Sequence, residues 1–294
     1  MGRSEVSSIK ILYGLLYGGL VAGIYLFTRL FGHNGGLNLF TLTVAIAFLL
    51  HLLVWPRLTL NGLKDRKMLL RGVFYGLTQV LILKAQANGH TSTALVASTM
   101  GSVFGVLFGR LLLKEKVTGL ALVALPFCVV ATLLNPLVIL SSYWGVLGGL
   151  IQGSGFVLAR SLMIEHKGTR ESISTGFGVG AIVGAIALAI DRDLASMWAI
   201  PSTTLLLTIT FVLIIQYAFF YLYKILDSQR ASMLLLSRIP WALGLEYTIF
   251  GIGIAVSQAI SSSLILIGAL LLALDANVRR ATVKSPLNPI RQRT

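Results

Sequence analysis

Residues 91–135 read TSTALVASTMGSVFGVLFGRLLLKEKVTGLALVALPFCVVATLLN, which is two apolar runs joined by the charged turn Lys114-Glu115-Lys116. Each run has the length of about 20 residues that an α-helix needs to cross a hydrocarbon core about 30 Å thick. A short turn between two such helices makes them antiparallel neighbours. The stretch therefore predicts a helical hairpin inside a membrane.

The same pattern extends over the rest of the chain. Only 12% of its 294 residues are charged and 56% are hydrophobic, whereas soluble domains carry about 25% charged residues. Ten apolar runs are present, and short loops and a tail leave no room for a soluble domain. They cover residues 9–31, 37–55, 68–88, 91–113, 117–135, 142–164, 171–190, 202–226, 229–250 and 254–275. We predict an all-α integral membrane protein with ten transmembrane helices, whose first run is retained and is not a signal peptide.

Basic residues are distributed unevenly between the two predicted sides of the membrane. The chain has 24 Lys and Arg against 10 Asp and Glu. Twenty of the 24 fall in the N-terminus, in the tail and beside alternate loops, among them Arg71 after the second run. Because basic residues accumulate on the cytoplasmic side, we expect both termini in the cytoplasm, in a bacterial inner membrane. The net charge of +14 then indicates orientation and not a nucleic-acid partner.

The two halves of the chain show signs of an internal repeat. We place the first five-helix repeat at residues 1–138, the second at 139–276 and a basic cytoplasmic tail at 277–294. An offset of 140 aligns Lys84 with Lys224, Ser92 with Ser232 and Leu95 with Leu235. Five spans are an odd number, so the two repeats are inverted relative to each other. Inverted repeats are a recurring plan of secondary transporters, with the substrate site at the midplane between them.

The hairpin and the ninth run also resemble a known family. Residues 113–118, LKEKVT, are similar to the Leu-Gly-Glu-x-Leu-Thr turn between helices four and five of the drug/metabolite transporter superfamily (EamA-like, ten spans). Residues 230–245, RASMLLLSRIPWALGL, resemble its ninth helix, including Pro240. Lys114 replaces the usual Gly, and Gly251-Ile252-Gly253 stands where a Glu is expected. The resemblance implies a transporter with its site between runs one, three, four, six, eight and nine.

Arg238 is the most unusual residue inside a predicted span. A charge at the membrane centre costs roughly 2.5–3.5 kcal/mol on insertion scales, so it needs a reason to be there. One interpretation is an anchor for a carboxylate or a phosphate, which a guanidinium binds through two hydrogen bonds. Pro240, two residues later, frees a backbone carbonyl and can open a cavity beside this anchor. The alternative is a structural ion pair, with Glu246 as the partner.

Seven more residues are candidates for substrate contact, each with a structural alternative. Glutamine amides in the spans offer hydrogen bonds, or hold helices together. Aromatic rings offer apolar walls, or simply pack. Lysines near span ends act as gates, or extend to the interface. The candidates beside Arg238 are Tyr17, Gln79, Lys84, Gln152, Gln216, Lys224 and Trp241.

Several chemistries have no sequence signal. There is no metal-ligand cluster, no phosphate-binding Gly-Lys-Ser/Thr loop and no nucleophile motif, so we expect neither a metal, a cofactor nor an enzyme. We therefore predict a secondary transporter that moves a small organic metabolite, amino-acid-like or anionic and phosphorylated, by alternating access. A channel-like or lipid-headgroup translocating protein is the alternative, followed by an intramembrane enzyme. The expected partners are a small-molecule substrate and the bilayer, without nucleic acid, and a homodimer stays open.

Overall fold

The computed structural model describes residues 3–32, 36–88, 91, 94–95, 98–115, 119–134, 143–165, 167–226, 231–232 and 234–282. Within these ranges the ordered elements are helices. They are α1 (Arg3–Phe31), α2 (Leu37–Val54), α3 (Pro56–Lys64), α4 (Arg66–Ala87), α6 (Met100–Leu113), α7 (Gly119–Leu133), α9 (Tyr143–Ile164), α10 (Thr169–Ile190), η2 (Leu194–Ala199), α11 (Ser202–Ile225), η3 (Leu235–Ser237), α13 (Arg238–Phe250) and α14 (Val256–Thr282).

These helices confirm the all-α membrane class. In the described ranges, six helices are long and apolar enough to cross a membrane: α1, α2, α4, α9, α10 and α11. The other four predicted runs contain α6, α7, α13 and α14; the apolar parts of α6, α7 and α14 are shorter, and α13 has 13 residues. Every predicted run thus corresponds to a helix, although helix length alone establishes six spans and not ten.

Two helical segments lie outside the predicted runs. Helix α3 fills the loop after the second run, where Pro56 occupies the first turn and only Thr59 and Gly62 are buried. It packs against α10, and a Cβ on Gly62 would lie 2.7 Å from the carbonyl oxygen of Glu171. At the other end of the chain, α14 continues to Thr282, inside the predicted tail. Residues 283–294 of that tail lie outside the described ranges.

The fourth and ninth runs are interrupted near their middle. Helix α6 begins only at Met100, and a 3-10 turn, Leu235–Ser237, precedes α13. The two segments contact each other beside the interruptions, because Ser102 Oγ in the first turn of α6 donates to the carbonyl oxygen of Ser232, which precedes the 3-10 turn, at 2.7 Å. Pro240 lies in the first turn of α13, where a missing N–H costs little. Interrupted helices that meet near mid-membrane are typical of transporter binding sites.

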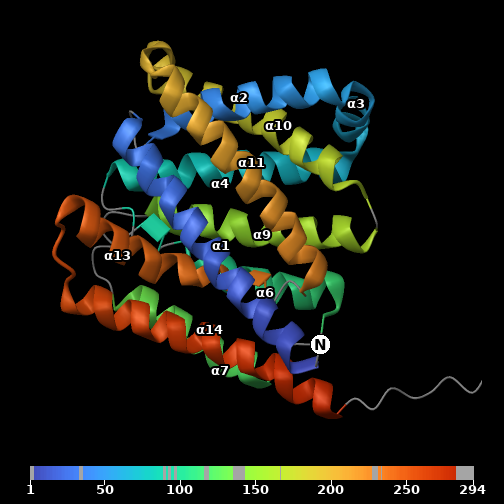
Figure 1. Cartoon of the computed structure of the whole chain (residues 1–294), viewed down its shortest axis with the longest axis vertical. Helices are drawn as coiled ribbons and strands as arrows, with labels where there is room; N and C mark the ends of the chain where they lie inside the picture. Colours follow the sequence, from blue (N-terminus) through green and yellow to red (C-terminus); the bar gives the residue numbers. More distant parts are fainter. Residues whose placement is uncertain are drawn as a thin grey trace, which may run out of the picture.

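The helices pack in a pattern that relates the two halves. Helix α9 contacts α4 and α6, and α1 contacts α11 and α13 in the same way. Likewise α4 contacts α10, and α11 contacts α2. The counterparts in the two halves are α1 and α9, α2 and α10, α4 and α11, and α6 and α13. Exchanging each helix for its counterpart turns each of these contacts into another of them. Figure 1 shows α1 and α11 crossing α4 and α9, with α2 and α3 at one end and α7 and α14 at the other.

Close glycine contacts occur at equivalent places in the two halves. Gly14 and Gly18 of α1 lie against Leu234 and Ser237, and Gly149 and Gly153 of α9 lie against Ser98 and Gly101. A Cβ on Gly153 would lie 2.7 Å from the carbonyl oxygen of Gly101, so the backbones touch. Small residues allow this approach between membrane helices. The contacts relate the halves by an offset of 135 or 136 positions, which differs from the 140 suggested by residue identities.

Candidate substrate-binding cavity

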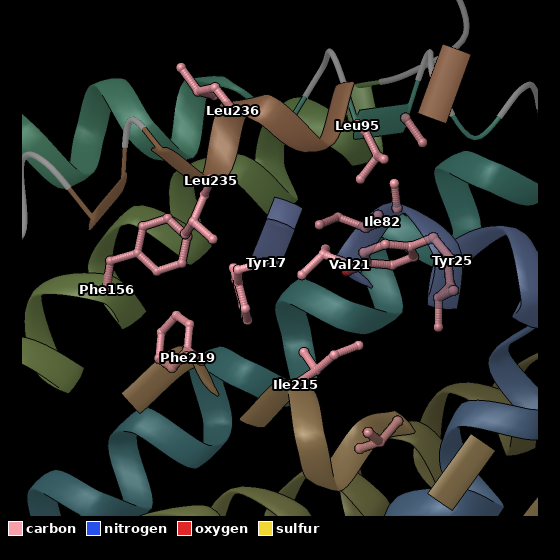
Figure 2. Packing of buried hydrophobic residues seen from close by; sticks show 14 of the residues in the cluster. Tyr17, Val21, Tyr25, Ile82, Leu95, Phe156, Ile215, Phe219, Leu235 and Leu236 are labelled. Atoms are coloured by element: carbon pink, nitrogen blue, oxygen red, sulfur yellow. The ribbon is translucent and has the colours of Figure 1, made fainter. Parts of the chain in front are cut away.

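A central cavity lies where α1, α4, α9, α11 and the start of α13 come together. Its volume is about 100 Å³, enough for several water molecules or part of a small solute. Aromatic and aliphatic side chains form much of the wall. Figure 2 shows Tyr17 of α1 near Phe156 of α9, Phe219 of α11 and Leu235 of η3, and all four line the cavity.

Arg238 enters this cavity from the first residue of α13. Its side chain is among the largest fully buried ones, with 2% of the residue exposed. Nη2 donates to Ser98 Oγ at 2.6 Å and to Gln152 Oε1 at 3.1 Å. The Nε hydrogen has no acceptor among the described residues. Arg238 is therefore held by neutral oxygens from two segments, and the described residues accept from only two of its five N–H donors.

The proposed ion pair between Arg238 and Glu246 is not formed. Glu246 lies on α13 but pairs with Arg29 of α1 at 3.0 Å. It also accepts the backbone N–H of Thr91 at 2.6 Å. Glu246 lies about two turns beyond Arg238 on α13, and it is not among the residues that line the cavity.

Arg71 is a second buried arginine in the cavity wall, although its place in the sequence assigns it to a cytoplasmic loop. That assignment is wrong, because α4 begins at Arg66 and carries Arg71 more than a turn into the bundle. The residue is 3% exposed. Its Nη1 donates to the carbonyl oxygen of Ser172 at 3.0 Å, and its Nη2 donates to Gln216 Oε1 at 3.1 Å. The guanidinium also lies over three rings, those of Tyr75, Phe219 and Phe220.

Five of the eight candidate residues line the cavity: Tyr17, Gln79, Gln152, Gln216 and Arg238. Gln152 and Gln216 use their carbonyl oxygens to hold the two arginines. Gln79 accepts a hydrogen bond from Tyr25 Oη at 2.7 Å, which orients its amide. The amides therefore connect helices and face the cavity at the same time.

The other three candidates lie outside the cavity lining. Lys84 pairs with Asp191 at 2.9 Å and lies over the ring of Trp144, near the end of α4. Lys224 is exposed beside a separate groove of α11 that Tyr13 and Tyr221 also line. Trp241 is 46% exposed and covers Gly19, with its Nε1 donating to the carbonyl oxygen of Leu15. Their positions favour the structural alternatives, namely an ion pair, an interfacial lysine and helix packing.

No carboxylate is present among the residues that line the cavity. The ion pairs in the described part of the chain lie at helix ends and in loops, and none includes Arg71 or Arg238. Two buried cations therefore face one small cavity without a counter-charge from the described residues. Burying charges in this way is costly unless an anion is supplied.

The side of the bundle that carries α3 has two linked ion pairs between loops. Asp65 at the start of α4 pairs with Lys167, and Lys67 pairs with Glu165. The hydrogen bond from Lys167 lowers the pKa of Asp65, and the one from Lys67 lowers the pKa of Glu165. Asp65 also caps α4 by accepting the N–H groups of Lys67 and Met68. These contacts join the α3–α4 turn to the α9–α10 loop.

Comparison with known protein families identifies one that the first half of the chain resembles. Residues 8–136 match the model of the EamA-like transporter family. The match covers less than half of the chain, and over these residues the sequence is similar to that family. The predicted resemblance to the drug/metabolite transporter superfamily is thereby confirmed, and the match includes α1, α4 and Arg71 of the cavity. EamA-like proteins are membrane transporters of small solutes and not an enzyme family, which agrees with the transporter class predicted above.

Other comparisons address the fold of the whole chain. No curated protein matches the sequence significantly. A solved structure described as "Crystal structure of protein" superposes with a TM-score of 0.63 at 18% identity, over 92% of this chain and 99% of that one. At this identity the match shows a shared fold, which includes the second half that the EamA-like family model does not reach.

Proposed function

We propose that this EamA-like protein is a secondary transporter of small organic anions, with the central cavity as its binding site. One observation carries the proposal: two buried arginines line the cavity, and no carboxylate does so among its lining residues. A bound carboxylate or phosphate supplies the missing negative charge. A guanidinium matches the planar oxygens of either group.

Arg238 is the proposed anchor for the acidic group. Its Nη2 is already positioned by Ser98 and Gln152, while its buried Nε has no acceptor among the described residues. Gln79 and Tyr17 offer further polar contacts from α4 and α1. The apolar wall for a carbon skeleton consists of Phe156, Phe219 and Leu235. The binding of an amino-acid-like solute through its carboxylate is compatible with the same anchor.

Alternating access between two inverted halves is the proposed transport cycle. Three features support it: the exchangeable packing pattern, the equivalent glycine contacts and the interrupted helices that meet at Ser102 and Ser232. Glycine contacts between helices leave few side chains to displace when one half rocks against the other. The site then lies on the interface between the moving parts, as in other inverted-repeat transporters.

The direct test is exchange in proteoliposomes. Purified protein is loaded with a radiolabelled anion and offered a panel of external anions, cations and zwitterions of similar size. We expect exchange of anions and its loss in Arg238→Gln, with normal exchange in the control Lys224→Gln, which alters a basic residue outside the cavity. Exchange of cations that Arg238→Gln leaves intact would refute the proposal.

A further inference from the structure

The position of Arg71 points to a second anion subsite in the same cavity. Arg71 comes from α4, and Arg238 comes from α13. Tyr17 lines the same cavity as the two arginines, on the facing helix α1. The cavity is therefore cationic in two places and not only at Arg238.

The two arginines are held in the same manner. Each donates one Nη2 hydrogen bond of 3.1 Å to the carbonyl oxygen of a glutamine, Gln216 for Arg71 and Gln152 for Arg238. An amide oxygen orients a guanidinium without neutralising it. A glutamate at either position would satisfy the same geometry and cancel the charge. Both arginines thus remain full cations that are oriented in advance, as an anion subsite requires.

A purely structural role for Arg71 explains only part of its surroundings. Its bond to Ser172 and its stacking on Phe220 join α4 to α10 and α11. These partners are neutral, however, and cation–π contacts contribute far less than a counter-ion to a buried charge. In the described part of the chain no carboxylate pairs with Arg71. A single monoanion at Arg238 would leave this second charge uncompensated.

We propose that the cavity binds solutes with two anionic groups, one held at Arg238 and the other at Arg71, with Tyr17 beside the connecting carbon chain. Dicarboxylates and phosphorylated carboxylates share this chemistry. The proposal rests on the proposed transport of anions and narrows it to dianions. Arg71 then determines specificity for the second charge, while Arg238 serves every accepted anion.

Matched pairs of solutes test the proposal. Succinate and succinamate have nearly the same size but differ by one charge, and 3-phosphoglycerate and glycerate differ by a phosphate. We expect the solute with two anionic groups, in one or both pairs, to compete for exchange at roughly 10-fold or more lower concentration than its partner, the effect of one charged hydrogen-bonded contact. The pair that shows the preference identifies the source of the second charge.

Variants of Arg71 assign the subsite. Arg71→Gln should remove the preference by weakening dianion binding roughly 10-fold or more while monoanion binding changes little, and Arg71→Lys should retain part of it. An equal loss for both members of each pair would assign Arg71 a structural role and overturn the proposal. If Arg71→Gln does not fold, thermal stabilisation of the unmodified protein by succinate and succinamate decides, since equal shifts overturn the proposal.

The test separates the two proposals. Exchange of monoanions and dianions with equal affinity would overturn the second subsite and leave an anion transporter. Absence of exchange for all four probes, with exchange of cations or neutral solutes, would overturn anion transport itself.

Discussion

Gln152 of α9 accepts a hydrogen bond from Nη2 of Arg238 at 3.1 Å, so an amide oxygen occupies the place of a neutralising carboxylate. Ser98 Oγ accepts from the same nitrogen at 2.6 Å. Arg238 therefore has a fixed orientation and an uncompensated charge. This relationship makes the charge of the cavity adjustable by one substitution.

Replacing Gln152 with Glu should convert the cavity from an anion site into an occupied ion pair. The new carboxylate would meet Arg238 in the existing geometry and compete with the substrate. We expect anion affinity to fall about 10- to 100-fold, which corresponds to about 1.5–3 kcal/mol, while the protein folds normally. Equilibrium binding in detergent and thermal unfolding measure the two effects. Unchanged anion affinity would show that Arg238 does not contact the substrate.

Much of the fold was predictable because membrane helices are selected by length and hydrophobicity. The predicted run 37–55 corresponds to α2 at Leu37–Val54, and the run 142–164 to α9 at Tyr143–Ile164. Helix α3 was missed because it is short and polar, and it is stabilised by packing on α10. The interruption before α13 was also missed, since Pro240 indicates a local irregularity but not its place.

The site was only partly predictable, and the two arginines show why. Arg238 stands alone in an apolar run, so its cost in the membrane draws attention to it. Arg71 follows Lys64, Arg66 and Lys67, so it looks like one more loop cation. Only the start of α4 at Arg66 and the direction of the side chain toward Phe220 reveal its burial. If the helix is counted from Arg66 and not from its first apolar residue, Arg71 falls more than one turn inside it, and this position indicates burial.

Adding a methyl group to Gly18 should disturb the contact between α1 and α13. A Cβ there would overlap Ser237 Oγ and lie 2.8 Å from the backbone nitrogen of Arg238. We expect Gly18→Ala to destabilise the protein by about 1–3 kcal/mol, the usual cost of overpacking, and to reduce exchange because Arg238 moves. Gly23→Ala is the matched control, since a Cβ at Gly23 meets nothing within 4 Å. Equal melting temperatures for the two variants would contradict the close contact.

The buried ion pair between Arg29 and Glu246 should contribute more to the stability of the fold than the more exposed pair between Lys84 and Asp191. The side chain of Glu246 is 3% exposed, and it holds both Arg29 and the N–H of Thr91. The Asp191 side chain that pairs with Lys84 is 25% exposed. We expect Glu246→Ala to cost about 3–5 kcal/mol and Asp191→Ala about 0–1 kcal/mol. Denaturant unfolding in detergent compares them, and the reverse order would show that Glu246 is not a structural link.

The loop ion pairs should make the stability of the folded protein depend on pH. Lys167 lowers the pKa of Asp65 in the folded protein, so the pair stabilises the fold above the unfolded pKa of Asp65. This stabilisation is lost as the pH falls through the lowered, folded pKa. We expect Asp65→Asn to melt earlier than the unmodified protein at pH 7, with the difference shrinking below about pH 4. A difference that stays constant from pH 7 to pH 3 would show that the ionised carboxylate of Asp65 does not contribute to stability.

Cysteine accessibility should establish which side of the bundle faces the cytoplasm. Lys64 is at the end of α3, on the side where α1 begins and α14 ends (Figure 1). Trp198 of η2 is 85% exposed in the connection between α10 and α11. With Cys128 replaced by Ser, we expect an impermeant maleimide added to intact cells to label Trp198→Cys and not Lys64→Cys, because the Lys64 side carries the excess of basic residues. Membrane disruption should expose Lys64→Cys. Labelling of Lys64→Cys in intact cells would invert the topology and place the Asp65–Lys167 contact outside.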